Sequence, residues 1–296
     1  MSDLTVSRSP SMKRQARTSM LLRYLLAVLA IAFALFPVIW VFSASLDPVG
    51  GLSSQRLIPT NASLENYRML LSGDERFPFL RWLWNSFYLA TLNSVLAVLI
   101  TSLSAYAFSR FRFRGRRNLL MTVFLVQVFP NILMMVALFL LLTQIGNYIP
   151  QLGIGSHGGL ILVYLGGVMG INVWLMKGFF DSVPRDIDES AMVDGATHWQ
   201  IFWMLIFPLV RPIVIVVGIL TFIGTYGDYL LARVLLTDPE QYTLMVGLWF
   251  FIAEQYSDNW GAFAAGGLMA ALPVVIIYLL LQDQIVGGLT QGAVKG

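Results

Sequence analysis

The sequence predicts an all-α membrane protein with six transmembrane helices, and three observations lead to this fold class. Of its 296 residues, 57% are hydrophobic and only 12% are charged, whereas soluble domains carry roughly 25% charged residues. A water-exposed globule could not cover this much apolar surface with polar groups, but a bilayer removes that requirement. The apolar residues form six long runs, and the lysines and arginines gather in alternate loops between them.

The first predicted span covers residues 20–43 and follows a polar, basic segment, 1–19, which we expect to form a poorly ordered cytoplasmic tail. Its apolar run, residues 21–42, is long enough to cross the hydrocarbon core, which takes roughly 20 residues. Cleaved signal peptides have apolar runs of about 7–15 residues, so we expect this longer run to be retained as a helix. Residues 44–83 are polar and contain several prolines and glycines, which predicts an extracytoplasmic loop.

Residues 84–283 are predicted to form a five-helix core, with spans at 84–107, 119–142, 159–175, 212–231 and 262–281. Trp82 and Trp84, at the start of the second span, are typical of interfacial anchors. Pro130 predicts a kink in the third span, because proline cannot donate the helical hydrogen bond. The segment between the fifth and sixth spans, 232–260, is predicted to be a loop.

Lysine and arginine residues predict the orientation of these spans. With the N-terminus in the cytoplasm, 14 of the 19 basic residues lie inside and 5 lie outside, as the positive-inside rule requires. Both termini are then cytoplasmic, and the chain ends in a cytoplasmic tail at 284–296. This topology accounts for the basic clusters, so we expect the lipid bilayer as a partner and no nucleic acid.

The sequence argues against catalysis in this chain. It has no cysteine, which excludes thiol chemistry, disulfides and zinc held by cysteine. The two histidines, His157 and His198, lie far apart in sequence, which disfavours a metal site. There is no G-x-x-x-x-G-K-[ST] phosphate-binding loop, so hydrolysis of ATP by this chain is not expected. We therefore expect no catalytic residue, no metal and no cofactor in this chain.

The long cytoplasmic loop before the fifth span is predicted to form two short helices at the membrane face. Pro184 suits a first helical turn, and Gly195 suits a helix C-terminus. Thr197 and Gln200 have the spacing of a capping box at the start of the second helix, which Pro208 is expected to end. The first helix is acidic, whereas segments attracted to anionic lipids are basic. Docking of a protein partner and a plain interfacial helix pair both remain open on these residues.

This loop resembles the Glu-Ala-Ala loop of binding-protein-dependent ABC import permeases. The matching motifs are Glu189-Ser-Ala191, Gly195 and Leu205-Ile-Phe-Pro208. The glutamate, the second alanine, the glycine and the proline keep the spacing of that family. The chain departs from the pattern at Ser190, Leu205 and Phe207, where the replacements are conservative in size or polarity.

The resemblance extends from about residue 20 to the end of the chain, and several further motifs narrow it. They resemble the smaller permease subunits of maltose/maltodextrin importers. These motifs are Trp82-Leu-Trp-Asn-Ser86, Gly146-Asn-Tyr-Ile-Pro150, His157-Gly-Gly159 and the ending Gly288-Leu-Thr-Gln-Gly-Ala-Val-Lys-Gly296.

The resemblance implies a type I ABC importer permease fold, with an N-terminal helix, a five-helix core and a cytoplasmic coupling helix. It also implies a homologous second permease subunit, two cytoplasmic ABC ATPase subunits that bind ATP and magnesium, and an extracytoplasmic sugar-binding protein. The coupling loop, residues 181–208, is then expected to contact the ATPase, and so is the C-terminal tail. The residues carried over are Glu189, Ser190, Ala191, Asp194, Gly195 and Pro208 in the loop, and Gly292 and Lys295 in the tail.

Asp228 is the one acidic residue within a predicted span. An acid inside the membrane is a functional residue by default, but Asp228 lies toward the outer end, where it can also be an interfacial residue in contact with water. Tyr226 and Tyr229 flank it and offer either faces for a sugar or ordinary interfacial aromatics. Lining of the pathway by these three residues remains one of two alternatives.

The implied function is half of the translocation pathway of a sugar importer in the bacterial cytoplasmic membrane, coupling ATPase closure to alternating access. Maltose and maltodextrin are the substrates of the subgroup, and trehalose or another oligosaccharide is an alternative. A secondary transporter or channel acting alone would show paired buried charges or an internal repeat, and neither is evident. A membrane anchor without a transport role is disfavoured by the polar residues inside several spans.

Overall fold

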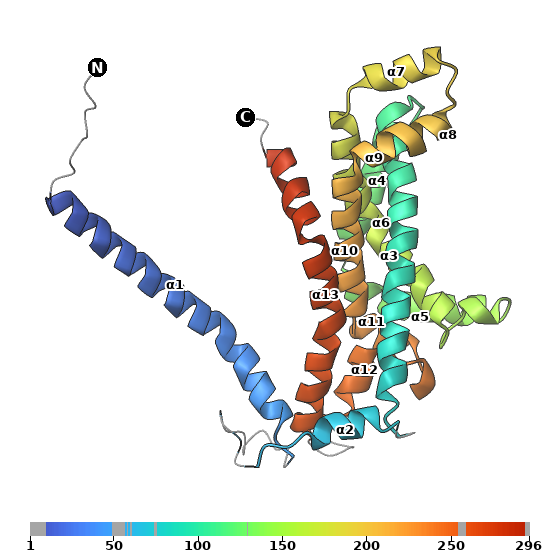
Figure 1. Ribbon diagram of the computed structural model, residues 1–296. Helices are drawn as coiled ribbons and strands as arrows, with labels where there is room; N and C mark the ends of the chain where they lie inside the picture. Colours follow the sequence, from blue (N-terminus) through green and yellow to red (C-terminus); the bar gives the residue numbers. More distant parts are fainter. Residues whose placement is uncertain are drawn as a thin grey trace.

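The protein is described by a computed structural model, which covers residues 10–48, 57, 59, 61–73, 76–128, 130–253 and 259–293. Throughout these residues it is helical, without a strand (Figure 1). The helices are α1 (Pro10–Ser45), α2 (Glu65–Leu71), α3 (Phe79–Arg110), α4 (Arg116–Val128), α5 (Asn131–Gly146), η2 (Pro150–Leu152), α6 (His157–Ser182), α7 (Arg185–Val193), α8 (His198–Gln200), η3 (Ile201–Ile206), α9 (Phe207–Leu209), α10 (Arg211–Tyr226), α11 (Leu230–Leu235), η4 (Pro239–Gln241), α12 (Leu244–Trp249) and α13 (Trp260–Ala293).

The six predicted spans are present, four as single helices and two as bent pairs. Among the described residues, α1, α3, α6 and α13 are each long and apolar enough to cross a bilayer. The other two crossings each combine two helices that meet at a short break, α4 with α5 and the α8–α9 run with α10. All-α architecture with six crossings is therefore confirmed, and the two breaks are features that length and hydropathy do not predict.

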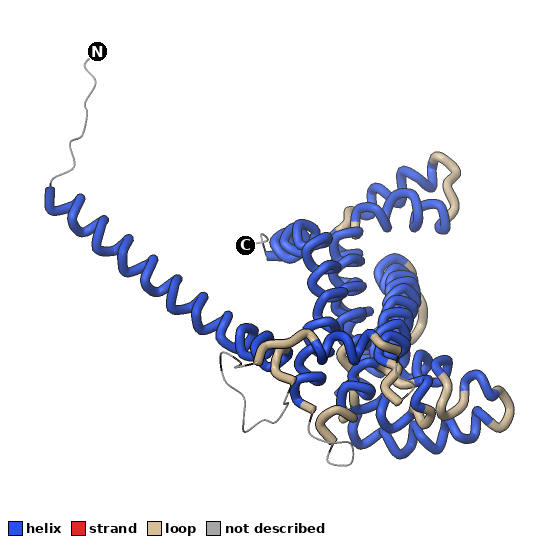
Figure 2. The backbone as a smooth tube through the Cα atoms, turned by 60° about the horizontal axis from the view of Figure 1, so that its bottom comes forward, coloured by secondary structure: helices blue, strands red, loops and turns tan. Residues whose placement is uncertain are grey.

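The first helix is longer than predicted and leans away from the bundle. It begins at Pro10, so the expected unstructured tail, 1–19, is helical over its second half. Figures 1 and 2 show from two directions that only the C-terminal end of α1 approaches the other helices. There Asn66 of α2 donates its side-chain amide to the Ser45 carbonyl at 3.0 Å. Helix α2 thus ties α1 to the bundle inside the segment predicted to be an extracytoplasmic loop.

The third span is broken where a kink was predicted. Helices α4 and α5 lie at 103° to each other, on either side of Pro130. Proline at a helix boundary removes one hydrogen bond and disfavours helical geometry in the preceding residue. Figure 1 shows α5 projecting sideways from the bundle as a result. The position of the break was predictable from Pro130, but its angle was not.

The predicted loop at 232–260 contains short helices and buried residues in its described part, 232–253. Helices α11 and α12 place Leu244, Val246 and other apolar side chains in the largest buried cluster. Trp82, predicted to be an interfacial anchor, is also buried there, 1% exposed, and its ring covers Gly247 so closely that a Cβ atom on that glycine would lie 2.0 Å from it. Apolar residues of this segment are buried against α3. The composition of the segment alone does not predict this packing.

The last helix also exceeds its prediction. Helix α13 continues to Ala293, so most of the segment expected as a tail, 284–296, is helical. Figure 1 shows the C-terminal end of α13 at the same end of the bundle as α7, and the N-terminal end of α1 points to that side as well. This arrangement agrees with both termini and the α7 region sharing one side of the membrane.

Helices α3, α6 and α10 form the centre of the bundle. Polar residues in the spans join them, because backbone and side-chain polar groups inside a membrane must find partners within the protein. Asn93 of α3 donates to Thr225 of α10 at 2.7 Å, and Ser94 donates to the Gly218 carbonyl at 2.7 Å. The central helices therefore form a hydrogen-bonded unit on which the coupling loop is mounted.

Candidate functional site

The predicted coupling loop forms a helical hairpin at one end of the bundle (Figure 1). Its first arm is α7, which follows Pro184 as predicted. Its second arm is the continuous run of α8, η3 and α9, from His198 to Leu209. We call α7 and this second arm the coupling hairpin.

The turn between the two arms depends on Gly195. Its φ of +85° lies in the left-handed region, which costs a residue with a side chain roughly 1–2 kcal/mol. The Gly195 amide donates to the Met192 carbonyl at 3.1 Å and the Ala196 amide to the Ala191 carbonyl at 2.9 Å, the two hydrogen bonds of a Schellman motif. No atom lies within 4 Å of a Cβ built on Gly195, so backbone conformation rather than space requires glycine. The predicted helix end at Gly195 is confirmed.

The second arm begins with the predicted capping box. The Gln200 amide donates to Thr197 Oγ1 at 3.3 Å, and the Thr197 amide donates to Gln200 Oε1 at 2.8 Å. These two bonds satisfy backbone donors that the first helical turn leaves free. The start of this arm was therefore specified by two residues three positions apart.

Pro208 does not end the second arm, contrary to prediction. It lies inside α9, and the helix stops at Leu209 before a bend of 79° into α10. The preceding turn, η3, is π-helical. Because proline cannot donate to the carbonyl four residues earlier, the wider hydrogen-bond spacing of a π-helix before it relieves that mismatch. The hairpin thus passes directly into the fifth span through an irregular, bent joint.

A buried ion pair fastens α7 to the bundle. Arg110, the last residue of α3, places Nε 2.8 Å from Asp188 Oδ2, and both side chains are at most 10% exposed. The same guanidinium donates to the Val183 carbonyl at 3.0 Å. Burial raises the pKa of the Asp188 carboxyl, and the nearby Arg110 acts in the opposite direction. Sequence reasoning assigned Arg110 to membrane orientation and missed this contact, since the partners are 78 positions apart.

Aromatic packing supports the second arm. Tyr106 of α3 lies edge-on to Phe202, with ring centroids 5.1 Å apart, and to Phe180 of α6 at 6.2 Å. Phe202 and Phe180 are themselves fully or almost fully buried. A displacement of the hairpin must therefore move α3, α6 and α10 together, as rigid packed elements do.

The outward face of the hairpin carries the predicted coupling residues. Glu189, Ser190 and Asp194 are exposed, whereas Ala191 is buried against the bundle. Next to them Val193 is 87% exposed and Trp199 is 61% exposed. Exposed apolar residues in a polar rim are typical of a protein-docking surface. Physical chemistry thus favours the partner-docking alternative over a bare interfacial helix pair.

A cavity of about 670 Å³ opens on the membrane-spanning part of the bundle. It lies between α4, α5, α6, α10 and α11. Its polar lining residues are Gln127, Tyr164, Asn172, Thr221, Thr225 and Asp228. Gln127 lines it from α4 and accepts the Ile171 amide of α6 at 3.0 Å. No arginine or lysine lines this cavity within the described part of the chain.

The three candidate pathway residues are not brought together. Asp228 lies in the cavity wall, where it accepts from Tyr164 Oη at 2.8 Å and from the Ala232 amide at 3.0 Å. Tyr226 is almost completely buried and donates to the Ala270 carbonyl of α13 at 3.0 Å. Tyr226 and Tyr229 border a separate apolar groove beside α12 and α13. Asp228 thus lines the polar cavity, whereas the two tyrosines line the separate groove.

Of the two tail residues predicted to contact the ATPase, only Gly292 lies within the described part of the chain. Gly292 lies within α13, close to its end at Ala293. Lys295 lies outside the described residues.

A six-crossing helical bundle with an exposed hairpin at one end and a polar cavity in its membrane-spanning part is the architecture of a membrane transport permease. Residues 97–287 match the model of a family described as "Binding-protein-dependent transport system inner membrane component", and the chain belongs to that family.

Similar proteins agree with this assignment. The chain is 41% identical over 276 residues to the maltose/maltodextrin transport system permease protein MalG of Vibrio vulnificus (strain YJ016), with 90% of this chain and 92% of that protein covered. It is 38% identical to the galactooligosaccharides transport system permease protein GanQ of Bacillus subtilis (strain 168), with 96% and 99% covered. A chain from the crystal structure of a bacterial ABC transporter that imports alginate has 27% identity and a TM-score of 0.71, with 94% and 99% covered.

The predicted class is therefore confirmed: the chain is a permease subunit of an ABC sugar importer. A secondary transporter acting alone and a membrane anchor are not favoured. Its family is a membrane transport component.

Proposed function

We propose that this chain couples ATPase motion to alternating access in an importer of maltose, maltodextrins or a closely related neutral oligosaccharide. The partners are a homologous second permease, two cytoplasmic ABC ATPase subunits that bind ATP and magnesium, and an extracytoplasmic sugar-binding protein. The observation that carries the coupling role is the exposed outer face of the hairpin around Glu189 and Val193.

The connections of the hairpin support a mechanical role. Its first arm is held to α3 by the Arg110–Asp188 pair. Its second arm continues through the bend after Leu209 into α10. A force applied by a docked ATPase thus reaches two central helices, α3 and α10, which pack on each other. Such a packed unit transmits the force as a rigid-body movement.

The cavity supports a neutral substrate. Sugars are bound by hydroxyl, amide and carboxylate groups, and the cavity wall offers Gln127, Asn172 and Asp228. A polyanion needs arginine or lysine partners, and the described lining contains none. The curated relatives named for maltodextrin and for galactooligosaccharides fit this chemistry better than an importer of acidic alginate does.

The orientation belongs to the same proposal. The hairpin, the C-terminal end of α13 and the N-terminal end of α1 are placed in the cytoplasm of a bacterial cell, where the ATPase lies. The excess of basic residues on that side supports it. In this arrangement the end of α13, with Gly292, extends toward the ATPase dimer, and the α11–α12 end faces the binding protein.

Purification of the assembled importer tests the coupling role. Gly195→Asp strains the turn and places a charge on the docking face, so we expect the permease pair to insert normally but to lose the ATPase. Val193→Asp adds the charge without backbone strain and should weaken ATPase retention as well. Gly73→Asp is the matched control, because Gly73 is also left-handed, with φ +75° and no neighbour within 4 Å of a Cβ, yet lies at the opposite end. Normal ATPase retention by both hairpin variants would refute the proposal.

A further inference from the structure

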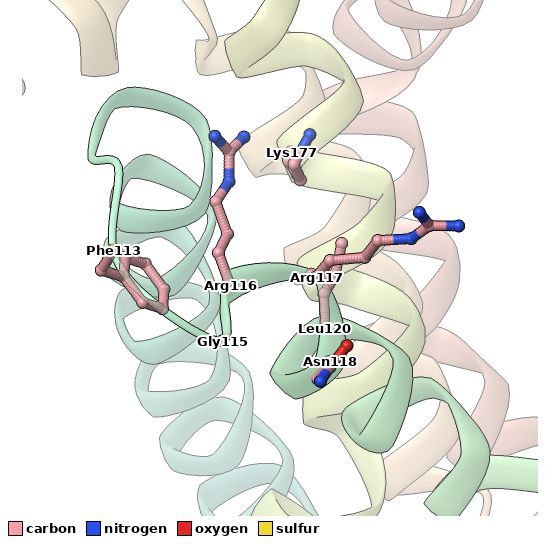
Figure 3. A pocket seen from close by; sticks show the side chains of 7 residues that line it. All are labelled: Phe113, Gly115, Arg116, Arg117, Asn118, Leu120 and Lys177. Carbon is pink, nitrogen blue, oxygen red and sulfur yellow. The ribbon is translucent and has the colours of Figure 1, made fainter.

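A second cavity, of about 570 Å³, lies at the hairpin end of the bundle, apart from the sugar cavity. It is formed by the turn before α4, the first turns of α4 and one turn of α6 (Figure 3). Its lining residues are Phe113, Gly115, Arg116, Arg117, Asn118, Leu120 and Lys177. We call it the basic cavity.

Three cationic side chains line this cavity. Figure 3 shows Arg116 and Arg117 extending in different directions from the start of α4, with Lys177 on the neighbouring turn of α6. Asp181 is paired with Lys177 and also accepts from Ser109 at 2.7 Å. Asp181 pairs with Lys177 alone among the three lining cations, so the basic cavity keeps an excess of positive charge.

The positive-inside rule explains how many arginines the α3–α4 loop contains, but it does not explain this arrangement. Orientation requires only that basic residues remain on one side of the membrane. Here residues from two helices, about 60 positions apart in sequence, surround one cavity, while Arg112 and Arg114 of the same loop are exposed and lie outside its lining.

An apolar aromatic surface adjoins the basic cavity on its membrane side. Trp174 of α6 donates to the Leu120 carbonyl of α4 at 3.2 Å, one turn below Lys177. Phe124 packs on Trp174 with ring centroids 5.7 Å apart, and both rings are well exposed, 42% and 38%. Tryptophan at this depth is typical of the membrane interface. A ligand that fills both regions must be anionic at one end and apolar at the other.

We propose that the basic cavity binds the phosphate headgroup of an anionic phospholipid from the same leaflet as the hairpin. Arg116, Arg117 and Lys177 hold the phosphate through charge-assisted hydrogen bonds, and the acyl chains lie along Phe124 and Trp174. A free phosphate ion would satisfy the cations but leave the aromatic surface unused, so the lipid is the better occupant. The proposed lipid site rests on the proposed orientation, in which the hairpin end of the bundle is cytoplasmic. It does not depend on which sugar is transported or on ATPase binding.

The test measures lipid selectivity of the purified full chain, or of the assembled importer, in vesicles. Spin-labelled phosphatidylglycerol and spin-labelled phosphatidylcholine report the fraction of lipid immobilised by the protein. The test variant is Arg116→Gln/Arg117→Gln. The matched control, Arg112→Gln/Arg114→Gln, removes the same charge from the same loop outside the cavity.

Wild type and the control should prefer phosphatidylglycerol. The test variant should lose about 25-fold in relative affinity at this site, since each basic residue near an anionic lipid surface contributes roughly fivefold. Asn118→Lys, which adds a cation to the rim without removing a contact, should raise the preference by about fivefold. An equal preference in both double variants together with no gain in Asn118→Lys would overturn the proposal. Displacement of the labelled lipid by millimolar inorganic phosphate at constant ionic strength would also overturn it, because the site would then take a free anion.

Discussion

The Arg110–Asp188 pair gives the sharpest prediction about how the hairpin is attached. Both charges are withdrawn from water, and the raised pKa of Asp188 indicates that burial outweighs the attraction of Arg110. Removing one partner leaves an uncompensated buried charge, which costs about 3 kcal/mol. Asp188→Leu alone should therefore destabilise the hairpin by that amount. Arg110→Met alone should cost about 5 kcal/mol, because the Val183 carbonyl also loses its donor.

The double variant should be far less affected than the sum of the two. Replacing both members of a buried pair by apolar residues of similar volume is often neutral. Here the Val183 carbonyl also loses its Arg110 donor at 3.0 Å, which costs about 2 kcal/mol. We thus expect the double variant to lose about 2 kcal/mol, against about 8 kcal/mol if the single effects were additive.

Hydrogen exchange of the α7 amides measures the free energy of local opening and completes the double-mutant cycle. The matched control is the pair Arg81–Glu240, whose side chains are 52% and 62% exposed. Its cycle with alanine should show a coupling below about 1 kcal/mol. An additive Arg110/Asp188 double variant would refute the reasoning, because the pair would then not act as a buried unit.

Two further predictions concern packing and the C-terminal end. Gly247→Ala should lower the stability of the purified protein by at least about 1–3 kcal/mol, because its Cβ would overlap the buried Trp82 ring. The control Gly267→Ala should be neutral, since no atom lies within 4 Å of a Cβ at that position. Equal melting temperatures of the two variants would contradict this packing. Deletion of residues 291–296 should lower maltodextrin-stimulated ATP hydrolysis by the reconstituted importer while leaving its assembly intact; unchanged uptake and hydrolysis would remove the role assigned to the tail.

Local signals in the coupling loop were predictable to the residue. Gly195 and the Thr197–Gln200 capping box act within a single turn, so their hydrogen bonds follow from spacing alone. Pro208 was misjudged because its effect depends on the π-helical turn before it, which no local pattern indicated. The hydrogen bond of Tyr226 to the Ala270 carbonyl of α13 was not predictable, because a tyrosine near an interface has the same sequence signature whether it faces a cavity or bonds to another helix.

By itself, the sequence determined the membrane class, the six crossings, the end of the first hairpin arm and the start of the second, since hydropathy, charge asymmetry and capping act over one helix or one turn. Tertiary structure alone decided the contacts that make the bundle a transmitting unit. Arg110 meets Asp188 across 78 positions, and Trp82 covers Gly247 across 165. The burial of residues 232–253 and the 103° angle of the break beside Pro130 were also decided by tertiary structure. Such features arise from shape and charge complementarity between distant segments, which one-dimensional periodicity does not encode.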